Sequence, residues 1–128
     1  MEPNEALAEL LTLSSQIVDV AILGGSGFVL ASSGTPERGE QLARIAAELL
    51  AAAAGVRPDG DIARIEVGLD GGSVFVVTEG GRSAVARTVP EPTAGLVVYD
   101  LRTALHRLDE APPAKPKPTR KRKRPADA

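Results

Sequence analysis

The sequence predicts an α+β domain built around an antiparallel sheet. One long segment, residues 35–55, has helical periodicity between clear start and stop signals. Two other regions, residues 17–32 and 62–89, contain short runs of alternating apolar residues separated by glycine-rich turns. The expected order of elements is therefore helix, two strands, helix, three strands and helix, or α-β-β-α-β-β-β-α. Strands that are gathered in hairpins and joined by helices are typical of the α+β class.

The long helix carries its own boundary signals. Thr35 is a good N-cap residue, and Pro36 then occupies the first helical position, where its missing N–H has no cost. Glu37 lies in the first turn, which suits the positive end of the helix dipole. Gly55 is expected to end the helix in the left-handed conformation, with Pro58 just beyond it. A helix with these ends is about 28 Å long, at about 1.5 Å per residue.

This helix has more apolar surface than one contact with a sheet requires. A first stripe, which can face the sheet, consists of Leu42, Ile45, Ala46, Leu49 and Ala53. A second strip of mostly small residues consists of Ala43, Ala47, Leu50, Ala51 and Ala54. Small side chains let another helix approach to about 8 Å between axes, so we expect this strip to contact a second copy of the chain. The alternative is that alanine serves here as a favourable helix former and nothing more.

A helix and a hairpin precede this segment. Asn4 is the expected cap of a first helix that ends near Ser14. Residues 17–23 alternate in the manner of a strand, and residues 28–32 return as a second strand. Because the sequence Gly-Gly-Ser-Gly at residues 24–27 predicts a turn, the two strands are expected to form a hairpin.

Three more strands and a helix follow the long helix. The expected strands are residues 62–69, 73–79 and 82–89, separated by the turn sequences Asp-Gly-Gly and Gly-Gly. The run at 73–79 is apolar on both faces, which is typical of an inner strand covered on both sides. Thr93 is the expected cap of a last helix ending near Leu108. The stripe that this helix buries is expected to be Val97, Leu101, Ala104, Leu105 and Leu108.

The composition excludes several classes of protein. The chain has 128 residues, enough for one folded domain, with no cysteine and one histidine. Disulfides, cysteine-ligated metals and paired-histidine sites are therefore excluded. No segment approaches the roughly 18–20 apolar residues of a membrane-spanning helix, and the acidic N-terminus is unlike a signal peptide. We expect a cytoplasmic protein.

The charge divides the chain into two regions. Residues 1–110 carry eight arginines and no lysine against sixteen acidic residues, a net charge of −8. Residues 111–128 carry seven basic residues against one acidic residue, a net charge of +6, and they are rich in proline without hydrophobic periodicity. We therefore predict a folded domain over residues 1–110 and a disordered basic tail over residues 111–128.

The basic tail is a candidate site for polyanions. Its cations are Lys115, Lys117, Arg120, Lys121, Arg122, Lys123 and Arg124. They can bind nucleic-acid phosphates without sequence preference, since the tail has no aromatic residue for base stacking. They can equally bind anionic lipid or an acidic protein surface, including that of this chain's own domain. A solubilising tail without a ligand is the alternative to all three.

No residue pattern indicates a catalytic centre, a metal or a cofactor. The turn at residues 24–27 is not followed by Gly-Lys-Ser/Thr and does not open a helix, so it does not match a phosphate-binding loop. His106 is expected on a solvated helical face, and Asp59 and Asp61 supply too few oxygen ligands for calcium. We expect a protein that is not an enzyme. The arginines considered as a finger for a GTPase, without a feature that selects one, are Arg57, Arg64, Arg82 and Arg87.

Three places in the sequence together resemble the roadblock/LC7 family, over about residues 6–108. The first is VAIL at residues 20–23, followed by a glycine-bearing turn and FVLAS at residues 28–32. The second is the long helix rich in alanine and leucine that follows Gly34. The third is AGL at residues 94–96, which leads into the last helix. The first turn carries Ser26-Gly27 where the family commonly has Asp-Gly.

The resemblance implies a five-stranded antiparallel sheet with the long helix on one face and the terminal helices on the other. It also implies a homodimer in which the third strands pair edge to edge and the two long helices pack together. Such pairing would explain why the strand at residues 62–69 need not be protected as a free edge. Ile62, Arg64 and Glu66 are therefore assigned to the dimer interface, where Arg64 and Glu66 can pair across the junction.

The function that the resemblance implies is a non-catalytic, dimeric regulator or scaffold of a small Ras-like GTPase. Two alternatives stay open on the sequence. One is an adaptor that binds nucleic acid or a membrane through the basic tail. The other is a small-ligand sensor with a PAS- or profilin-like sheet, which the few aromatic residues disfavour.

Overall fold

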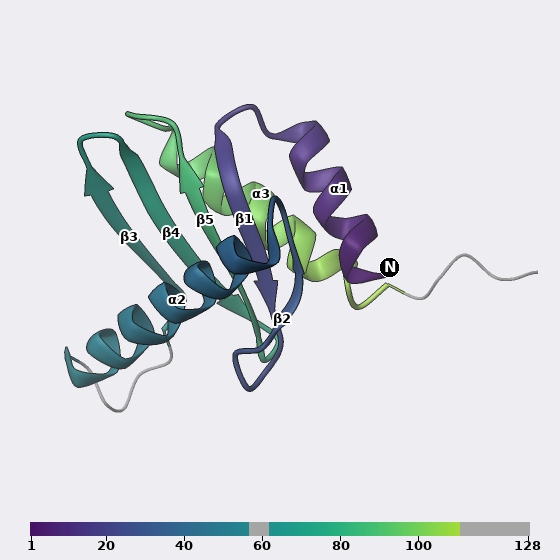
Figure 1. Cartoon of the computed structure of the whole chain (residues 1–128), viewed down its shortest axis with the longest axis horizontal. Coiled ribbons are helices and arrows are strands. Elements are labelled where there is room, and N and C mark those ends of the chain that lie inside the picture. Colours follow the sequence, from purple (N-terminus) through teal and green to yellow (C-terminus); the bar gives the residue numbers. More distant parts are fainter. Residues whose placement is uncertain (57–61, 111–128) are drawn as a thin grey trace, which may run out of the picture.

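The computed structural model describes residues 1–56 and 62–110 of the chain. They form three helices and five strands in the predicted order (Figure 1). The elements are α1 (Pro3–Leu13), β1 (Ile17–Leu23), β2 (Val29–Ser32), α2 (Pro36–Val56), β3 (Arg64–Leu69), β4 (Gly72–Glu79), β5 (Arg82–Thr88) and α3 (Ala94–Arg107). The predicted disordered tail of residues 111–128, and with it the predicted domain boundary, lies outside the described residues.

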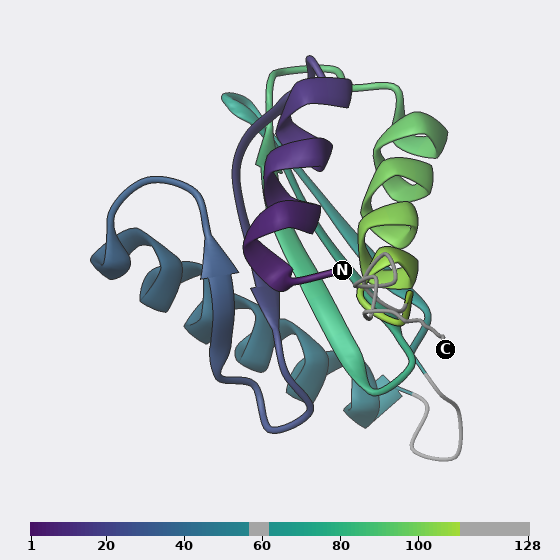
Figure 2. The same cartoon turned by 90° about the vertical axis from the view of Figure 1, so that its right-hand side faces the viewer.

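The five strands form one antiparallel sheet in the order β2-β1-β5-β4-β3. Figure 2 shows α2 on one face of this sheet and both α1 and α3 on the other. The α+β class, the antiparallel sheet and the distribution of the helices are therefore confirmed. β2 and β3 lie at the two edges, with β5 in the centre.

The sheet separates two apolar cores. The α1/α3 core contains Val20 and Ile22 of β1, and the α2 core contains Ala21 and Leu23 of the same strand. Strand β4 is divided in the same way, which confirms the prediction that the run at 73–79 is covered on both faces. Alternate side chains of the inner strands thus hold the helices of both layers.

The first helix begins earlier than predicted. Its N-cap is Glu2 and its first residue is Pro3, so the assignment of Asn4 as the cap is wrong. The reason is a capping box, in which the Glu2 N–H donates to Oε1 of Glu5 at 3.2 Å.

A hydrogen-bonded ion pair joins α1 to α3. Arg107 of α3 donates from Nε to Oε1 of Glu9 in α1 at 2.7 Å. The hydrogen bond from Arg107 lowers the pKa of the Glu9 carboxyl, against the opposing effect of desolvation.

The long helix begins as predicted and ends later. The Arg38 N–H donates to Oγ1 of Thr35 at 3.1 Å, which confirms the cap. Gly55 lies inside the last turn, because the helix continues to Val56 and Gly55 is not among the glycines with positive φ. The prediction that Gly55 ends the helix is therefore wrong. Glycine stops a helix when it adopts the left-handed conformation, and it can equally adopt the right-handed one.

Four strand boundaries differ from the predicted ones by one or two residues. β2 begins at Val29, and the preceding Phe28 is 58% exposed. β3 begins at Arg64, although the chain already runs beside β4 at Ala63, whose carbonyl accepts a hydrogen bond from the Thr78 N–H at 3.1 Å. β4 begins at Gly72, one residue before the predicted start. β5 ends at Thr88, one residue before the predicted end. These differences lie within the usual uncertainty of element ends.

An ion-pair cluster in the sheet anchors the N-terminal half of α2. Asp19 of β1 lies opposite Arg87 of β5 in the register and accepts hydrogen bonds through Oδ2 from Arg87 Nη2 at 2.7 Å and from Arg38 Nε at 3.1 Å. Burial of Asp19 raises the pKa of its carboxyl, but the hydrogen bonds and positive charges of Arg87 and Arg38 together outweigh burial and leave this pKa below its ordinary value of 3.8. The cluster therefore ties three elements together through one carboxylate.

Two tight hairpins build the other half of the sheet. Gly80 and Gly81 connect β4 to β5 with φ of 63° and 78°, the conformation that a two-residue turn of the favoured twist requires. At the β3–β4 hairpin, Gly72 has a φ of 140°, and a Cβ at this position would lie 2.0 Å from the Thr88 carbonyl oxygen. Glycine at position 72 is required by both the backbone conformation and the neighbouring strand.

Replacing Gly72 with alanine is expected to lower the free energy of unfolding by about 2–4 kcal/mol, because the new Cβ meets backbone atoms of β5 and the φ is strained. Urea unfolding followed by circular dichroism measures this loss. Gly71→Ala is the matched control, since a Cβ at Gly71 meets nothing within 4 Å. Equal stability of the two variants would contradict the close approach of β4 and β5 at this turn.

Replacing Asp19 with asparagine is expected to lower the free energy of unfolding at pH 7 by about 2 kcal/mol, because it removes the charged acceptor of two arginines. Since the pKa of Asp19 is lower in the folded chain than its ordinary 3.8, its stabilising effect is present above that value. The effect is lost as the pH falls through the lower folded pKa. Unfolding at several pH values should therefore show the two proteins converging in acid.

The control for this prediction is Asp109→Asn, which removes the partner of Arg82 in an ion pair whose carboxylate is largely exposed. Its effect on stability should be much smaller. A difference between wild type and Asp19→Asn that stays constant from pH 7 to pH 3 would contradict the assigned role of the Asp19 charge.

Candidate protein–protein interface

The edge strand β3 is the first part of the candidate interface. Among the described residues it pairs with β4 alone, and the six residues Arg64–Leu69 alternate between exposed and half-buried side chains over most of their length. The opposite edge strand, β2, has four residues and contacts both α1 and α2. β3 is therefore the longer and less covered edge of the sheet.

The second part is the exposed face of α2. Leu42 and Ala46 of the first stripe are buried in the α2 core, and Leu49 packs against it. Ile45 and Ala53 of the same stripe are half-buried and lie outside this core, so the stripe faces the sheet through its other three residues. Three residues of the second strip are exposed: Ala47, Ala51 and Ala54. The other two, Ala43 and Leu50, are half-buried and pack against the margin of the same core.

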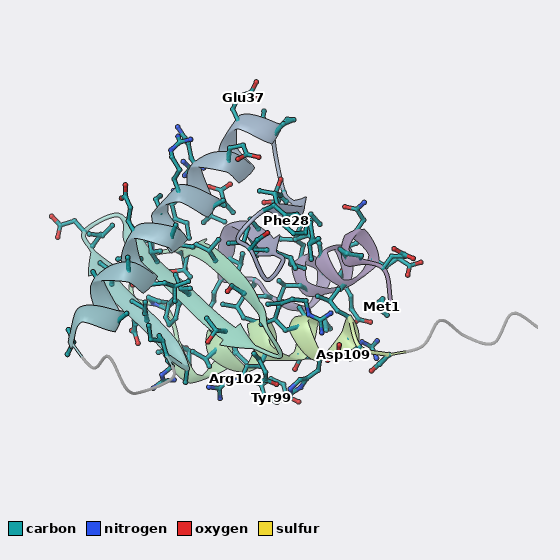
Figure 3. All side chains as sticks on the ribbon, turned by 90° about the horizontal axis from the view of Figure 1, so that it is seen from below. Met1, Phe28, Glu37, Tyr99, Arg102 and Asp109 are labelled. Atoms are coloured by element: carbon teal, nitrogen blue, oxygen red, sulfur yellow. The ribbon has the colours of Figure 1, made fainter. Side chains whose placement is uncertain are left out.

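The C-terminal turns of α2 project beyond the sheet. Figures 1 and 3 show this end of the helix extending past the edge that β3 forms. Consistent with this position, Val56 is 86% exposed, and the neighbouring Ala51, Ala52 and Ala54 are exposed as well. The fold thus brings an unpaired strand edge and an apolar helix end to one side of the molecule.

The residues assigned to the interface do not all lie on one face. Ile65 and Val67 of β3 pair with Val76 and Val74, which belong to the α2 core or pack against it. Arg64 and Glu66 point to the other side of the sheet, because their pairing partners in β4 belong to the α1/α3 core. The candidate surface therefore wraps around the edge of the sheet.

Ile62 lies between these parts. It is half-buried, and its carbonyl accepts a hydrogen bond from Thr78 Oγ1 of β4. Its place beside β4 extends the exposed edge by two residues before β3 begins. The seven cations assigned to the basic tail lie outside the described residues, so the fold does not place them relative to this surface.

The arginines considered as a GTPase finger are in different surroundings. Arg82 pairs with Asp109, and Arg87 pairs with Asp19, so both arginines form ion pairs within the folded domain. Arg64 is exposed on β3, and Arg57 lies outside the described residues. His106 is exposed, as predicted, and contacts the carboxylate of Glu79, a partner that the sequence did not indicate.

A second exposed apolar region lies between α1 and α3. Leu13 and Tyr99 are each 67% exposed and border a groove of about 140 Å³. Figure 3 shows Tyr99 on the outer side of α3, on the face opposite α2. Burial raises the pKa of the Asp100 carboxyl in this groove, and a hydrogen bond from Ser14 opposes that rise. No local pattern in the sequence indicates this groove, because it forms between helices far apart in the chain.

The described residues show no other kind of site. In residues 1–56 and 62–110, no cluster of three or more His, Asp or Glu side chains could hold a metal ion. Within the same ranges, no helix is both long and apolar enough to cross a membrane. The glycine-rich turn at 24–27 joins two strands, as predicted, and does not begin a helix.

Solved structures with the same fold are available for comparison. A Roadblock/LC7 domain from Streptomyces avermitilis is 22% identical with a TM-score of 0.72, covering 82% of this chain and 92% of its own. MglB from Myxococcus xanthus is 18% identical with a TM-score of 0.68, covering 84% of each chain. The gliding protein MglB from Thermus thermophilus is 20% identical with a TM-score of 0.62, covering 81% of this chain and 86% of its own. The comparison with curated proteins finds no match.

These structural similarities establish a shared fold. The sequence profile of the Roadblock/LC7 domain matches residues 3–85, from the start of α1 into β5. The match includes the first hairpin and the long helix that carry the resemblance in the sequence, and it covers more than half of the chain. The chain belongs to the Roadblock/LC7 domain family.

Proposed function

We propose that this protein is a non-catalytic homodimer that regulates or scaffolds a small Ras-like GTPase in the cytoplasm. The observation that carries the proposal is the joint exposure of the β3 edge and the apolar end of α2 in a Roadblock/LC7 domain. A family of this kind implies a GTPase as the partner. The described residues offer side chains for protein contacts and no cluster for metal-based chemistry.

We infer a dimer because a monomer would expose both the free β3 edge and apolar α2 surface to water. A strand edge with unpaired N–H and C=O groups favours pairing with another chain. The adjacent α2 surface consists of small apolar side chains, which allow close helix packing. Burying both on a twofold axis would satisfy the strand edge and remove apolar surface from water at about 25 cal/mol per Å². A second copy of the chain offers both complements at once.

Replacing Ala47 with glutamate is expected to convert the dimer to a monomer. Ala47 is exposed in the single chain, so the substitution should leave the fold intact. In the proposed dimer the new carboxylate would be buried without a partner, at a cost of several kcal/mol, or about a hundredfold or more in the dissociation constant. Light scattering measures the mass, and circular dichroism checks the fold.

The matched control is Gln41→Glu, which adds the same charge at an exposed position on the polar face of α2. It should remain dimeric. If Ala47→Glu were as dimeric as the control, the strip would be helix-forming residues without a partner. A monomeric wild type would contradict the proposed dimer itself.

The distribution of charge favours a second function, in the tail. Every lysine of the chain lies between Lys115 and Lys123, next to three arginines. Such a cluster supports binding to nucleic acid or anionic lipid through phosphates, with strong salt dependence. We propose this polyanion binding as an activity separate from that of the domain, since the domain itself carries a net charge of −8 over residues 1–110.

Deleting residues 115–124 is expected to separate the two functions. Binding to a Ras-like GTPase encoded alongside this chain should survive the deletion, because it belongs to the domain. Binding to a DNA duplex or to phosphatidylserine vesicles should be lost. Pull-downs with the GTPase in its GDP and GTP-analogue states measure the first, and titrations at two salt concentrations measure the second.

A tail with the same residues in scrambled order is the control, because charge-driven binding should persist in it. Failure to bind such GTPases in either nucleotide state would contradict the main proposal. Loss of GTPase binding on deletion would place the tail in that contact.

A further inference from the structure

We propose that the two β3 strands of the dimer pair in one specific register, centred on Ile65, with Arg64 opposite the partner's Glu66 on both sides of the twofold axis. This inference rests on the proposed dimer and goes beyond it. Among the described residues, no ion pair involves Arg64 or Glu66, although both are charged and exposed. The fold therefore leaves a positive and a negative side chain two positions apart on a free edge.

The backbone groups of β3 point alternately toward β4 and toward the free edge. The Thr78 N–H donates to the Ala63 carbonyl, and Leu69 pairs with Gly72 across the two-residue hairpin turn. Residues 63, 65, 67 and 69 therefore direct their N–H and C=O groups toward β4. In an antiparallel strand the intervening residues direct theirs the opposite way. Arg64, Glu66 and Gly68 thus offer their backbone groups to a partner strand.

Twofold symmetry limits the registers in which two β3 strands can pair. A twofold axis perpendicular to the sheet makes the two β3 strands antiparallel and keeps both α2 helices on one face. Residues directly opposite each other in such a ladder must both face the partner strand or both face away from it. The axis must therefore pass through one residue and not between two. The free edge of the sheet runs from residue 62 to residue 69. An axis through Ile65 or Glu66 therefore gives the two strands their longest overlap.

The charges on β3 distinguish the register centred on Ile65 from the one centred on Glu66. With Glu66 on the axis, two carboxylates would lie directly opposite each other, an arrangement that destabilises a strand pair. With Ile65 on the axis, Arg64 lies opposite the partner's Glu66, and the same pair forms a second time by symmetry. Opposite charges at directly facing positions stabilise a strand pair. The register centred on Ile65 is therefore the favoured one.

The apolar residues on the α2 side of the sheet also favour the register centred on Ile65. In the same register Ile65 meets the partner's Ile65, and Ala63 lies opposite the partner's Val67. Ile65 packs at the margin of the α2 core, and Val67 is half-buried. These side chains would form a continuous apolar surface against which the projecting ends of the two α2 helices can pack. One face of the junction would be apolar and the other would carry two ion pairs.

Cysteine cross-linking tests the register directly, because the chain contains no cysteine. Arg64→Cys and Glu66→Cys are made in the full chain, one of them with an added mass tag, and are mixed under oxidised glutathione. Directly opposite residues lie about 4.5–5.5 Å apart between Cα atoms, within the range of a disulfide. The mixture should form a mixed disulfide, and Ile65→Cys should cross-link to itself. Non-reducing gels and mass spectrometry identify the products.

Two controls test whether the cross-links report the register. Arg64→Cys and Glu66→Cys alone should cross-link poorly, because identical residues would be diagonal neighbours about 7–8 Å apart. Thr12→Cys, exposed on α1, should give no cross-link. Efficient self-linking of Glu66→Cys would overturn the register in favour of one centred on Glu66. Absence of every β3 cross-link in a protein that light scattering shows to be dimeric would remove β3 from the junction.

Charge reversal provides a second measurement. Arg64→Glu and Glu66→Arg should each raise the dimer dissociation constant by about tenfold or more, since two attractive pairs become repulsive. An equimolar mixture should form a heterodimer, and the double reversal should restore the homodimer. Glu40→Arg, on the polar face of α2, is the control for the change in charge. A double variant as weak as the single ones would contradict the pairing, whereas a monomeric wild type would contradict the underlying dimer.

Discussion

The two-sided sheet is the constraint on which the rest of this structure depends. Inner strands β1, β5 and β4 bury side chains in both directions, so each strand must supply two cores with alternate residues. Val20 and Ala21 show the division, since they are adjacent and fully buried on opposite faces. A shift of one residue in register would exchange these sets and place every side chain in the wrong core. The apolar runs therefore fix the pairing of the strands as well as their existence.

The same constraint leaves one edge of the sheet with the least cover by helices. α1, α3 and most of α2 are used to cover the inner strands, and β3 receives the least cover. Asp19 holds the N-terminal half of α2 over β1 and β5, which directs the C-terminal half toward and past the β3 edge. The free outer edge of β3 and an exposed helix end then lie on the same side of the molecule. A second copy of the chain can cover both because each copy presents the same strand edge and helix end.

The charges of the chain differ between the domain and the tail. The domain has excess acid, and its ion pairs join elements within the fold, as Arg107 joins α3 to Glu9 of α1. Every lysine of the chain lies between residues 115 and 123, outside the domain. The two proposed functions, GTPase regulation and polyanion binding, are therefore assigned to different parts of the 128-residue chain. On the β3 edge, Arg64 and Glu66 have no ion-pair partner among the described residues.

The sequence by itself determined the elements, their order and the family, because alternation, helical periodicity and the Thr35 cap are local signals. It also singled out the alanine strip as surplus apolar surface, although its partner stays a prediction. It failed at Glu2 and Gly55, where several conformations suit the same residues. Tertiary structure alone decided the Asp19 cluster, the α1/α3 groove and the projection of α2 past β3. These depend on strand order and on contacts between residues far apart in the chain, and no local pattern of side chains encodes such distances.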